Sequence, residues 1–285
     1  MAPTTRRRAL GALAGALALG AVTPQLAQAT ERGHGPRPLL RAHAHNDYDH
    51  PRPLFDALDH RFNSVEADIY LVDGDLLVAH DPVDLDPDRT LESLYLAPLA
   101  ARVKANRGAV YRGRRIPLQL LIDIKTEGAA TYVELDRQLR RHRDLFTTYA
   151  HGRVRTGPVT AVISGDRAAR APMEAQRTRS AFYDGRLTDL ATPAPASFVP
   201  LISDNWANNF TWQGAGPIPA AERDKLRAIV SAAHARRQRV RFWATPDLAG
   251  PERDAVWSEL IAADVDHLNT DDLAGLEAFL DAHDR

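Results

Sequence analysis

Hydrophobic positions along the chain follow two alternating spacings. Short apolar runs of strand type are followed by longer segments whose apolar residues recur at helical spacing. The short runs predict eight strands, at Leu39–His45, Ser64–Leu71, Leu118–Ile124, Val159–Ser164, Ser180–Tyr183, Phe198–Ser203, Val240–Ala244 and Val265–Asn269. The longer segments predict helices near Pro53–His60, Thr90–Arg107, Ala130–Leu145, Ala168–Arg177, Ala220–Arg237, Glu252–Ala263 and Asp271–Ala282.

This alternation of strands and helices predicts an α/β fold with a parallel sheet and crossover helices. Eight repeats in about 250 residues favour a closed (β/α)8 TIM barrel over an open sheet. The fifth strand has the weakest pattern, so an imperfect barrel or a barrel with seven helices is the alternative. The segment "VDGDLL" predicts a hairpin into a short extra strand, Leu76–His80. In a TIM barrel, the active site lies where the strands end on their C-terminal side.

The N-terminal residues have a pattern of their own. Arg6-Arg7-Arg8 precedes the apolar run "ALGALAGALALGAV", and Ala27-Gln28-Ala29 is a small-x-small cleavage signature. Adjacent arginines favour the twin-arginine export route. An uncleaved membrane anchor is the alternative, but the run is shorter than the ~20 residues of a spanning helix. We therefore expect a signal peptide at 1–29, a flexible leader at 30–38, one domain at 39–285, and a secreted protein.

Composition narrows the partners of the mature chain. Without the signal peptide, 33 basic residues face 37 acidic ones, a net charge of −4. Such a surface argues against broad binding of nucleic acid, which requires a basic face. The sequence has no cysteine, so disulfides and zinc–thiolate sites are excluded.

Three carboxylates are predicted to meet at the mouth of the barrel. Glu66 and Asp68 are two apart on one strand and so share a face, and Asp123 closes the otherwise apolar third strand. Acids on one strand face are unfavourable unless they are paired or bound to a cation. Oxygen ligands without thiolates suit one hard divalent cation, Mg²⁺ or Ca²⁺. The alternative is that these acids pair with some of the many arginines.

Basic side chains flank these carboxylates in the sequence. Lys125 is one of only three lysines against 33 arginines, which suggests a compact point charge that contacts a phosphate or carboxylate. His43 and His45 end the first strand on one face, and His80 ends the short extra strand. Two imidazoles beside a metal site suit a general base and a general acid, because their pKa lies near working pH. We expect His45 and His80 in these roles, with His43 orienting His45 or the metal.

Two later segments offer further candidates. Trp243 ends the seventh strand, and Thr270 or Asp271 is the expected N-cap of the last helix. The loop "SDNWANNFTW", residues 203–212, either lines a substrate lip or caps the end of the barrel.

These residues in their order resemble the superfamily of PI-PLC-like phosphodiesterases, which are TIM barrels. The superfamily includes glycerophosphodiester phosphodiesterases, phosphatidylinositol phospholipases C and spider-venom sphingomyelinase D. "HNDY" and "PLFDAL" look closest to the branch related to altered inheritance of mitochondria protein 6. The resemblance is carried by His45, Glu66-x-Asp68, His80-Asp81, Asp123-x-Lys125, Trp243 and Asp271.

The resemblance implies a role for each matching residue. His45 and His80 become the catalytic pair, and Glu66, Asp68 and Asp123 the metal ligands. Residues expected to bind the substrate are Lys125, Trp243, His43 and Asn46. The "HRG" and "ENT" motifs of glycerophosphodiesterases are absent, because Asn46-Asp47 follows His45 and "PLF" stands where "ENT" would be. The substrate thus stays open among a phospholipid headgroup, a glycerophosphodiester and a cell-wall polymer.

Together with the signal-peptide pattern, the resemblance implies a secreted, metal-dependent phosphoric diester hydrolase of lipid metabolism. We expect a monomer that acts on a small-molecule or lipid phosphodiester and makes at most peripheral contact with membranes. The nearest rival is a zinc amidohydrolase, since "HAH" fits its first strand, but such enzymes also need histidines from middle strands. A glycosidase with two carboxylates would leave the histidine pair unexplained. A barrel that binds its ligand without turning it over has the same fold, so the fold does not exclude it.

Overall fold

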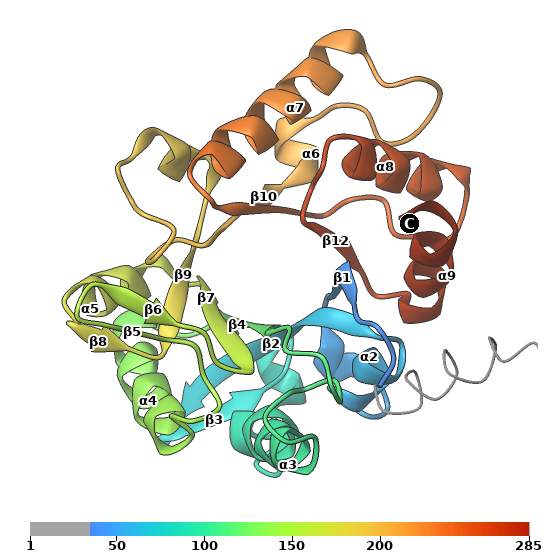
Figure 1. Ribbon diagram of the computed structural model, residues 1–285. Coiled ribbons are helices and arrows are strands. Elements are labelled where there is room, and N and C mark those ends of the chain that lie inside the picture. The colour runs from blue at the N-terminus through green and yellow to red at the C-terminus, as the bar shows by residue number, and fades with distance from the viewer. Residues whose placement is uncertain (1–34, 285) are drawn as a thin grey trace, which may run out of the picture. The chain divides into compact units, whose positions relative to one another are not determined.

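A computed structural model describes residues 35–284 of the chain, and the expected signal peptide and most of the expected leader lie outside them. Within the described residues, eight parallel strands form a closed barrel (Figure 1). Strand β1 pairs with both β2 and β12, which closes the sheet. The barrel strands are β1 (Leu39–Ala44), β2 (Phe62–Val72), β4 (Leu118–Ile124), β7 (Val159–Gly165), β9 (Ala181–Gly185), β10 (Leu201–Asn205), β11 (Arg239–Trp243) and β12 (His267–Thr270). The predicted α/β barrel and its eight strands are confirmed.

Helices surround the barrel on its outer side (Figure 1). The α-helices are α2 (Phe55–Asp59), α3 (Ala97–Ala105), α4 (Gly128–Arg141), α5 (Arg170–Glu174), α6 (Trp206–Asn209), α7 (Ala220–Ala235), α8 (Pro251–Ala262) and α9 (Leu273–His283). None of the helices in residues 35–284 is long and apolar enough to cross a bilayer.

The barrel is irregular after its fifth strand, where the sequence pattern is weakest. Between β9 and β10 the chain forms only a short 3-10 helix, η5 (Leu187–Ala191). Pro193 and Pro195 follow, and proline in a helix interior removes a hydrogen bond and clashes with the preceding turn. The predicted helix 90–107 is also divided, into a π-helix, η3 (Glu92–Leu96), and α3.

Several short elements complete the domain. Strand β3 (Asp75–Val78) pairs antiparallel with β2 as the predicted hairpin, but it ends two residues before His80. A small sheet of β5 (Thr148–Ala150), β6 (Arg153–Arg155) and β8 (Thr178–Arg179) was not predicted. All of β6 is exposed, so it lacks the buried face that gives a strand its alternating pattern. The 3-10 helices are η1 (Asp47–Asp49), η2 (Pro82–Asp84) and η4 (Arg167–Ala169).

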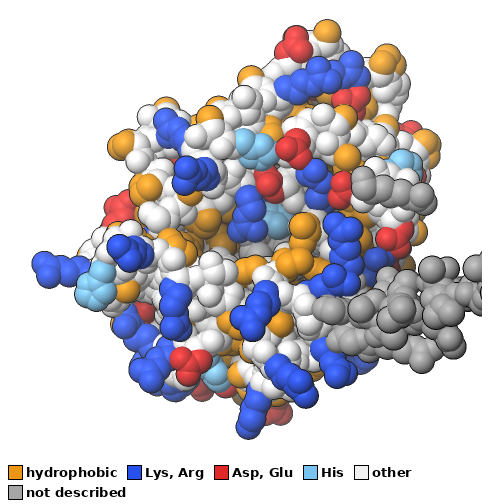
Figure 2. All heavy atoms as spheres, in the orientation of Figure 1, with side chains coloured by type: hydrophobic (Ala, Val, Ile, Leu, Met, Phe, Trp, Pro, Cys, Tyr) orange, Lys and Arg blue, Asp and Glu red, His pale blue; other side chains and the backbone are white. Residues whose placement is uncertain are grey.

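Side chains inside the barrel form layers along its axis. On β4, Gln119, Leu121 and Asp123 alternate with Leu120, Ile122 and Ile124, which belong to the large core packed outside the strands. Leu121 joins a small separate apolar cluster with Val162 and Leu201. Polar side chains therefore lie on both sides of this apolar layer. In the space-filling view along the barrel, the surface is hollowed near the middle, and Lys, Arg, Asp and Glu side chains are interspersed around the hollow (Figure 2).

Two expectations about the later segments are decided by packing. The N-cap of α9 is Asp272, whose carboxylate accepts from Gly275 N, and not Thr270 or Asp271. Thr270 instead bridges Asp247 and the backbone of Asp272. The aromatic side chains of loop 203–212 are buried, with Trp206 stacked on Phe210 at 4.1 Å between ring centroids. This loop therefore caps the barrel wall and does not form an open lip.

Candidate active site and metal centre

Glu66, Asp68 and Asp123 lie together at the C-terminal end of the barrel. Asp68 of β2 and Asp123 of β4 are directly opposite each other in the parallel register. One carboxylate oxygen from each of the three residues lies within 4.8 Å of the others. Glu66 is 4% exposed and Asp68 1% exposed, so their charges are largely shielded from water.

Glu66 is the neutralised member of the carboxylate cluster. Its Oε2 accepts hydrogen bonds from Arg241 Nη2 at 2.6 Å and His43 Nε2 at 3.0 Å. Burial raises the pKa of Glu66, but the Arg241 charge and the His43 hydrogen bond outweigh it and hold the pKa below its ordinary value. Glu66 is therefore ionised and held in place at neutral pH.

Asp68 and Asp123 share a single lysine. Lys125 Nζ lies 2.9 Å from Asp68 Oδ2 and 3.5 Å from Asp123 Oδ1. Burial and the Glu66 charge raise the pKa of Asp68, and burial raises the pKa of Asp123 to about 7. Tyr48 Oη donates to Asp68 Oδ2 at 2.6 Å, whereas Asp68 Oδ1 is buried without a hydrogen-bond partner in residues 35–284.

This arrangement fits a bound divalent cation. The donor set is entirely oxygen, as Mg²⁺ and Ca²⁺ prefer, and Asp68 supplies a buried oxygen that no other group uses. The expected alternative, pairing with arginines, holds for Glu66 through Arg241. Lys125 contacts the other two carboxylates and leaves them with pKa values above their ordinary range. Pairing with arginine therefore accounts for one acid of the three.

His45 follows β1 and borders the carboxylate cluster. Its Nδ1 lies 2.8 Å from Asp271 Oδ1, and because a carboxylate only accepts, Nδ1 carries the proton and Nε2 is the basic nitrogen. Burial lowers the pKa of His45, but the Asp271 hydrogen bond and the Glu66 charge raise it above its ordinary value.

His80 lies on the other side of the cluster. Its Nδ1 is 3.4 Å from Asp68 Oδ2 and 3.2 Å from Tyr48 Oη. The side chain is 52% exposed, so solvent or a ligand can reach it. His45 and His80 therefore border the three carboxylates from two different loops.

Comparisons with known proteins identify the family of this chain. A family model described as the AIM6-like phosphodiesterase domain matches residues 37–184, which is more than half of the chain. The chain belongs to the AIM6-like phosphodiesterase family. A second model, for the glycerophosphoryl diester phosphodiesterase family, matches residues 239–274. The resemblance drawn from the sequence is thus confirmed.

Curated relatives agree with this family, and a solved structure has a similar fold. The altered inheritance of mitochondria protein 6 homolog of Arthroderma benhamiae is 28% identical over 87% of this chain and 85% of its own length. Altered inheritance of mitochondria protein 6 of Eremothecium gossypii is 30% identical, over 85% of this chain and 69% of its own length. A glycerophosphoryl diester phosphodiesterase structure from Parabacteroides distasonis has a TM-score of 0.52 at 12% identity, over 88% of this chain and 89% of its own, and shows the fold alone.

The remaining residues expected at the site of this AIM6-like domain differ in how deeply they are buried. His43 is fully buried, with Nδ1 2.6 Å from Ser64 Oγ and Nε2 bonded to Glu66, so it has no free nitrogen for a substrate. Burial and the Arg241 charge lower the pKa of His43 to about 3. Asn46 Oδ1 lies 2.7 Å from Tyr48 Oη, and Trp243 is partly exposed at the end of β11.

Three residues to which the sequence reasoning gave no role at the site hold the site of this AIM6-like domain together. Tyr48 contacts Asp68 and His80, Arg241 neutralises Glu66, and the Asp271 side chain orients His45. Arg241 could have been found because it shares a strand face with Trp243. Tyr48 reaches the site through the turn at Asn46, where φ is 45°, and the sequence pattern does not specify that turn.

The opposite wall of the barrel mouth carries another polar group. Asp184, at the end of β9, is fully buried and accepts from Ser164 Oγ and Ser203 Oγ at 2.8 and 2.5 Å. Arg186 Nη1 also donates to Asp184 at 2.8 Å. Although burial lowers the pKa of Arg186, Asp184 and the charge of Asp123 raise it. Arg186 therefore lies within electrostatic reach of the metal centre.

Proposed function

We propose that this AIM6-like domain is a metal-dependent phosphoric diester hydrolase that acts on a phospholipid headgroup or a glycerophosphodiester. The proposal rests chiefly on one observation, the convergence of Glu66, Asp68 and Asp123 with Lys125 at the strand ends. Membership of a phosphodiesterase family supports the same reaction class. The cation contacts and the roles of the histidines follow from the chemistry of this arrangement.

Asp68, Asp123 and Glu66 are the residues that would hold Mg²⁺ or Ca²⁺. When bound, such a cation acts as a Lewis acid that offsets charge on a phosphoryl oxygen. Lys125 donates hydrogen bonds to the same phosphate, because its ammonium group is a compact donor beside Asp68 and Asp123. Tyr48 fixes one oxygen of Asp68 and leaves the second oxygen open.

The two histidines divide the proton transfers. Asp271 holds the proton on Nδ1 of His45, so Nε2 takes the proton from the attacking hydroxyl or water. That oxygen forms a bond to phosphorus while the bond to the leaving oxygen breaks, and His80 protonates the leaving oxygen. If the substrate carries a hydroxyl beside the phosphate, its own oxygen attacks and a cyclic phosphate forms first. The exposed ring of His80 suits a leaving group that departs to solvent.

Turnover of bis-p-nitrophenyl phosphate tests this assignment. We expect hydrolysis that is lost with EDTA and restored by Mg²⁺ or Ca²⁺. His45→Ala and His80→Ala should each lower kcat by about a hundredfold or more, the usual contribution of general acid–base catalysis. His151→Ala is the matched control, because His151 is an exposed turn residue outside the barrel mouth.

The control variant should keep full activity, and circular dichroism should show all three variants folded. Folded His45→Ala and His80→Ala variants with near wild-type rates would refute the catalytic pair. Activity that persists in EDTA would refute the metal requirement. Two tightly bound zinc ions would favour an amidohydrolase. A panel of phospholipids and deacylated glycerophosphodiesters, each with Mg²⁺ and Ca²⁺, would then identify the substrate.

We also propose that the enzyme works outside the cytoplasm, on the basis of the arginine-led apolar segment of residues 1–29. Fractionation of a bacterial host that expresses the full chain tests this proposal. We expect a processed form outside the inner membrane, and Arg6, Arg7 and Arg8 changed together to Lys should retain it in the cytoplasm. Export that is insensitive to this change would refute the twin-arginine route.

A further inference from the structure

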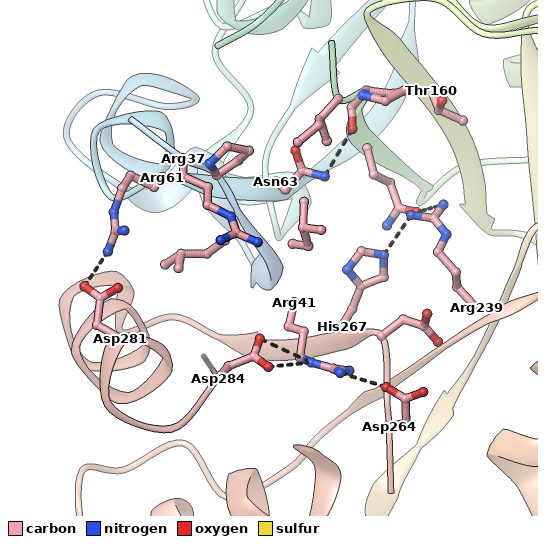
Figure 3. Close-up of a pocket in the computed structure, with 17 residues that line it drawn as sticks. Arg37, Arg41, Arg61, Asn63, Thr160, Arg239, Asp264, His267, Asp281 and Asp284 are labelled. Atoms are coloured by element: carbon pink, nitrogen blue, oxygen red, sulfur yellow. Dashed lines mark hydrogen bonds and ion pairs between the residues drawn. The ribbon is translucent and has the colours of Figure 1, made fainter. Parts of the chain in front are cut away.

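A second polar cavity lies at the opposite end of the barrel from the metal centre. Its volume is about 890 Å³, and the starts of β1, β4, β11 and β12 contribute to its wall (Figure 3). Along β4, the inward positions run from Gln119 in this cavity, through Leu121 in the apolar layer, to Asp123 at the metal centre. The two sites are therefore separate.

Arg239 is a partly buried cation that its neighbours do not neutralise. Its Nη1 donates to His267 Nε2 at 3.1 Å and its Nη2 to Gln119 Oε1 at 2.6 Å, and both acceptors are uncharged. No carboxylate in residues 35–284 lies within salt-bridge distance of Arg239. Burial lowers the pKa of Arg239, as expected for a guanidinium removed from water. The charge of Asp266 raises this pKa, but the effect of burial is larger.

The acids around the cavity are bound to other partners. Asp266 Oδ2 accepts from Val240 N and His234 Nε2, both at 2.8 Å. Arg37, in contrast, is exposed, makes no ion pair or hydrogen bond with the rest of residues 35–284, and turns its guanidinium into the cavity (Figure 3). The rim pairs are Arg41 with Asp264 and Asp284, Arg61 with Asp281, and His234 with Asp266.

Two neutral side chains in the wall have unsatisfied polar atoms. A guanidinium has no acceptor, so His267 Nε2 must accept from Arg239 and Nδ1 must carry the ring proton. His267 is 1% exposed, and its Nδ1 has no acceptor in residues 35–284. Figure 3 shows this side of the ring turned away from Arg239. Asn63 donates to Pro117 O at 3.1 Å, and its buried Oδ1 receives no donor in the same residues.

We propose that this cavity binds a small oxyanion of the phosphate class. Arg239 and Arg37 supply the positive charge, and guanidinium groups match the oxygens of phosphate in a bidentate way. Hydrogen phosphate also has a hydroxyl group, which donates to an acceptor such as Asn63 Oδ1 while its other oxygens accept from the arginines and His267. Sulfate has the same shape and no hydroxyl, so it binds less tightly.

Isothermal titration calorimetry of the EDTA-treated protein with inorganic phosphate tests the proposal. Arg239→Gln and Arg37→Gln should each weaken phosphate binding by about tenfold or more, the usual effect of losing a charged hydrogen bond. Arg227→Gln, on the exposed side of α7, is the matched control and should bind like the wild type. Asp123→Asn tests the far end of the barrel and should also leave phosphate binding unchanged.

Sulfate in place of phosphate should bind more weakly to the wild type, and Asn63→Leu should reduce that preference. Arg37 is exposed, so Arg37→Gln is decisive even if Arg239→Gln does not fold. Absence of phosphate binding, or equal binding by a folded arginine variant and the wild type, would overturn the site. A change in phosphate affinity in Asp123→Asn, with both arginine variants unchanged, would assign the phosphate to the metal centre. Equal affinity for sulfate would overturn the phosphate class.

Discussion

Cation binding by the carboxylate cluster should weaken as the pH falls below 7. Burial, together with the charges of Asp68 and Glu66, raises the pKa of Asp123 to about 7. A carboxyl group must lose its proton before it can bind a divalent cation, so protons compete with the metal. The pKa of Glu66 is held below its ordinary value, so Glu66 contributes no competition in this range.

The size of the effect follows from the pKa of Asp123. With a pKa of about 7, the ionised fraction falls from roughly nine-tenths at pH 8 to roughly one-tenth at pH 6. The affinity for Mg²⁺ or Ca²⁺ should therefore fall by about tenfold over this range, or about 1.4 kcal/mol. Because Asp68 and Asp123 interact, the proton belongs to the pair and not to either residue alone.

Calorimetry at pH 6, 7 and 8 measures this dependence directly. Titrations in two buffers with different ionisation enthalpies count the protons released, and we expect close to one per cation at pH 6. Asp123→Asn should weaken binding and flatten its pH dependence, whereas Asp75→Asn, an exposed control, should leave both unchanged. Affinity that is independent of pH, with no proton released, would refute the reasoning that Asp123 is a protonated ligand.

Three further predictions use other residues of the domain. Asp271→Asn removes a charge that raises the pKa of His45. The acidic limb of the pH profile of kcat/KM should therefore move to lower pH. An acidic limb that does not move would contradict the pairing of Asp271 with His45. Burial raises the pKa of Asp47 to about 7, so the folded state binds the Asp47 proton more tightly than the unfolded state does. The folded state therefore loses stability as the pH rises from about 4 to 7. Between pH 5 and 8, the free energy of unfolding from urea titrations should fall by about 2 to 3 kcal/mol more in the wild type than in Asp47→Asn, and equal slopes would contradict this. Lys125→Met should lower kcat by about a hundredfold. Lys104→Met, on the exposed side of α3, is the control and should have no effect. A fully active Lys125→Met variant would exclude a phosphate contact.

Much of the fold was predictable because the barrel strands carry strong local signals. Leu118–Ile124 is apolar except for Gln119 and Asp123, and both of these point into the barrel. The same period-two rule predicted that Glu66 and Asp68 share a face, which brings them close to Asp123 in a parallel register. The closed barrel then followed from counting the strand and helix repeats.

The contacts that tune the site could not be read from the sequence. The ion pair of Arg241 with Glu66 joins residues 175 positions apart, and the contact of His45 with Asp271 spans 226. Such pairs depend on the closure of the barrel, because β1 lies between β2 and β12. Local patterns specify which face a side chain occupies, but not which partner it meets across the barrel.

The charges at the site explain why a hydrolase of this design would need a cation. Three carboxylates, Glu66, Asp68 and Asp123, face two fixed cations, Arg241 and Lys125. At a pH where all three acids are ionised, the cluster has one net negative charge and repels a phosphodiester anion. A divalent cation reverses that sign, so the same site then attracts the substrate. Removal of the metal should therefore weaken substrate binding as well as turnover, whereas loss of His45 or His80 should affect turnover alone.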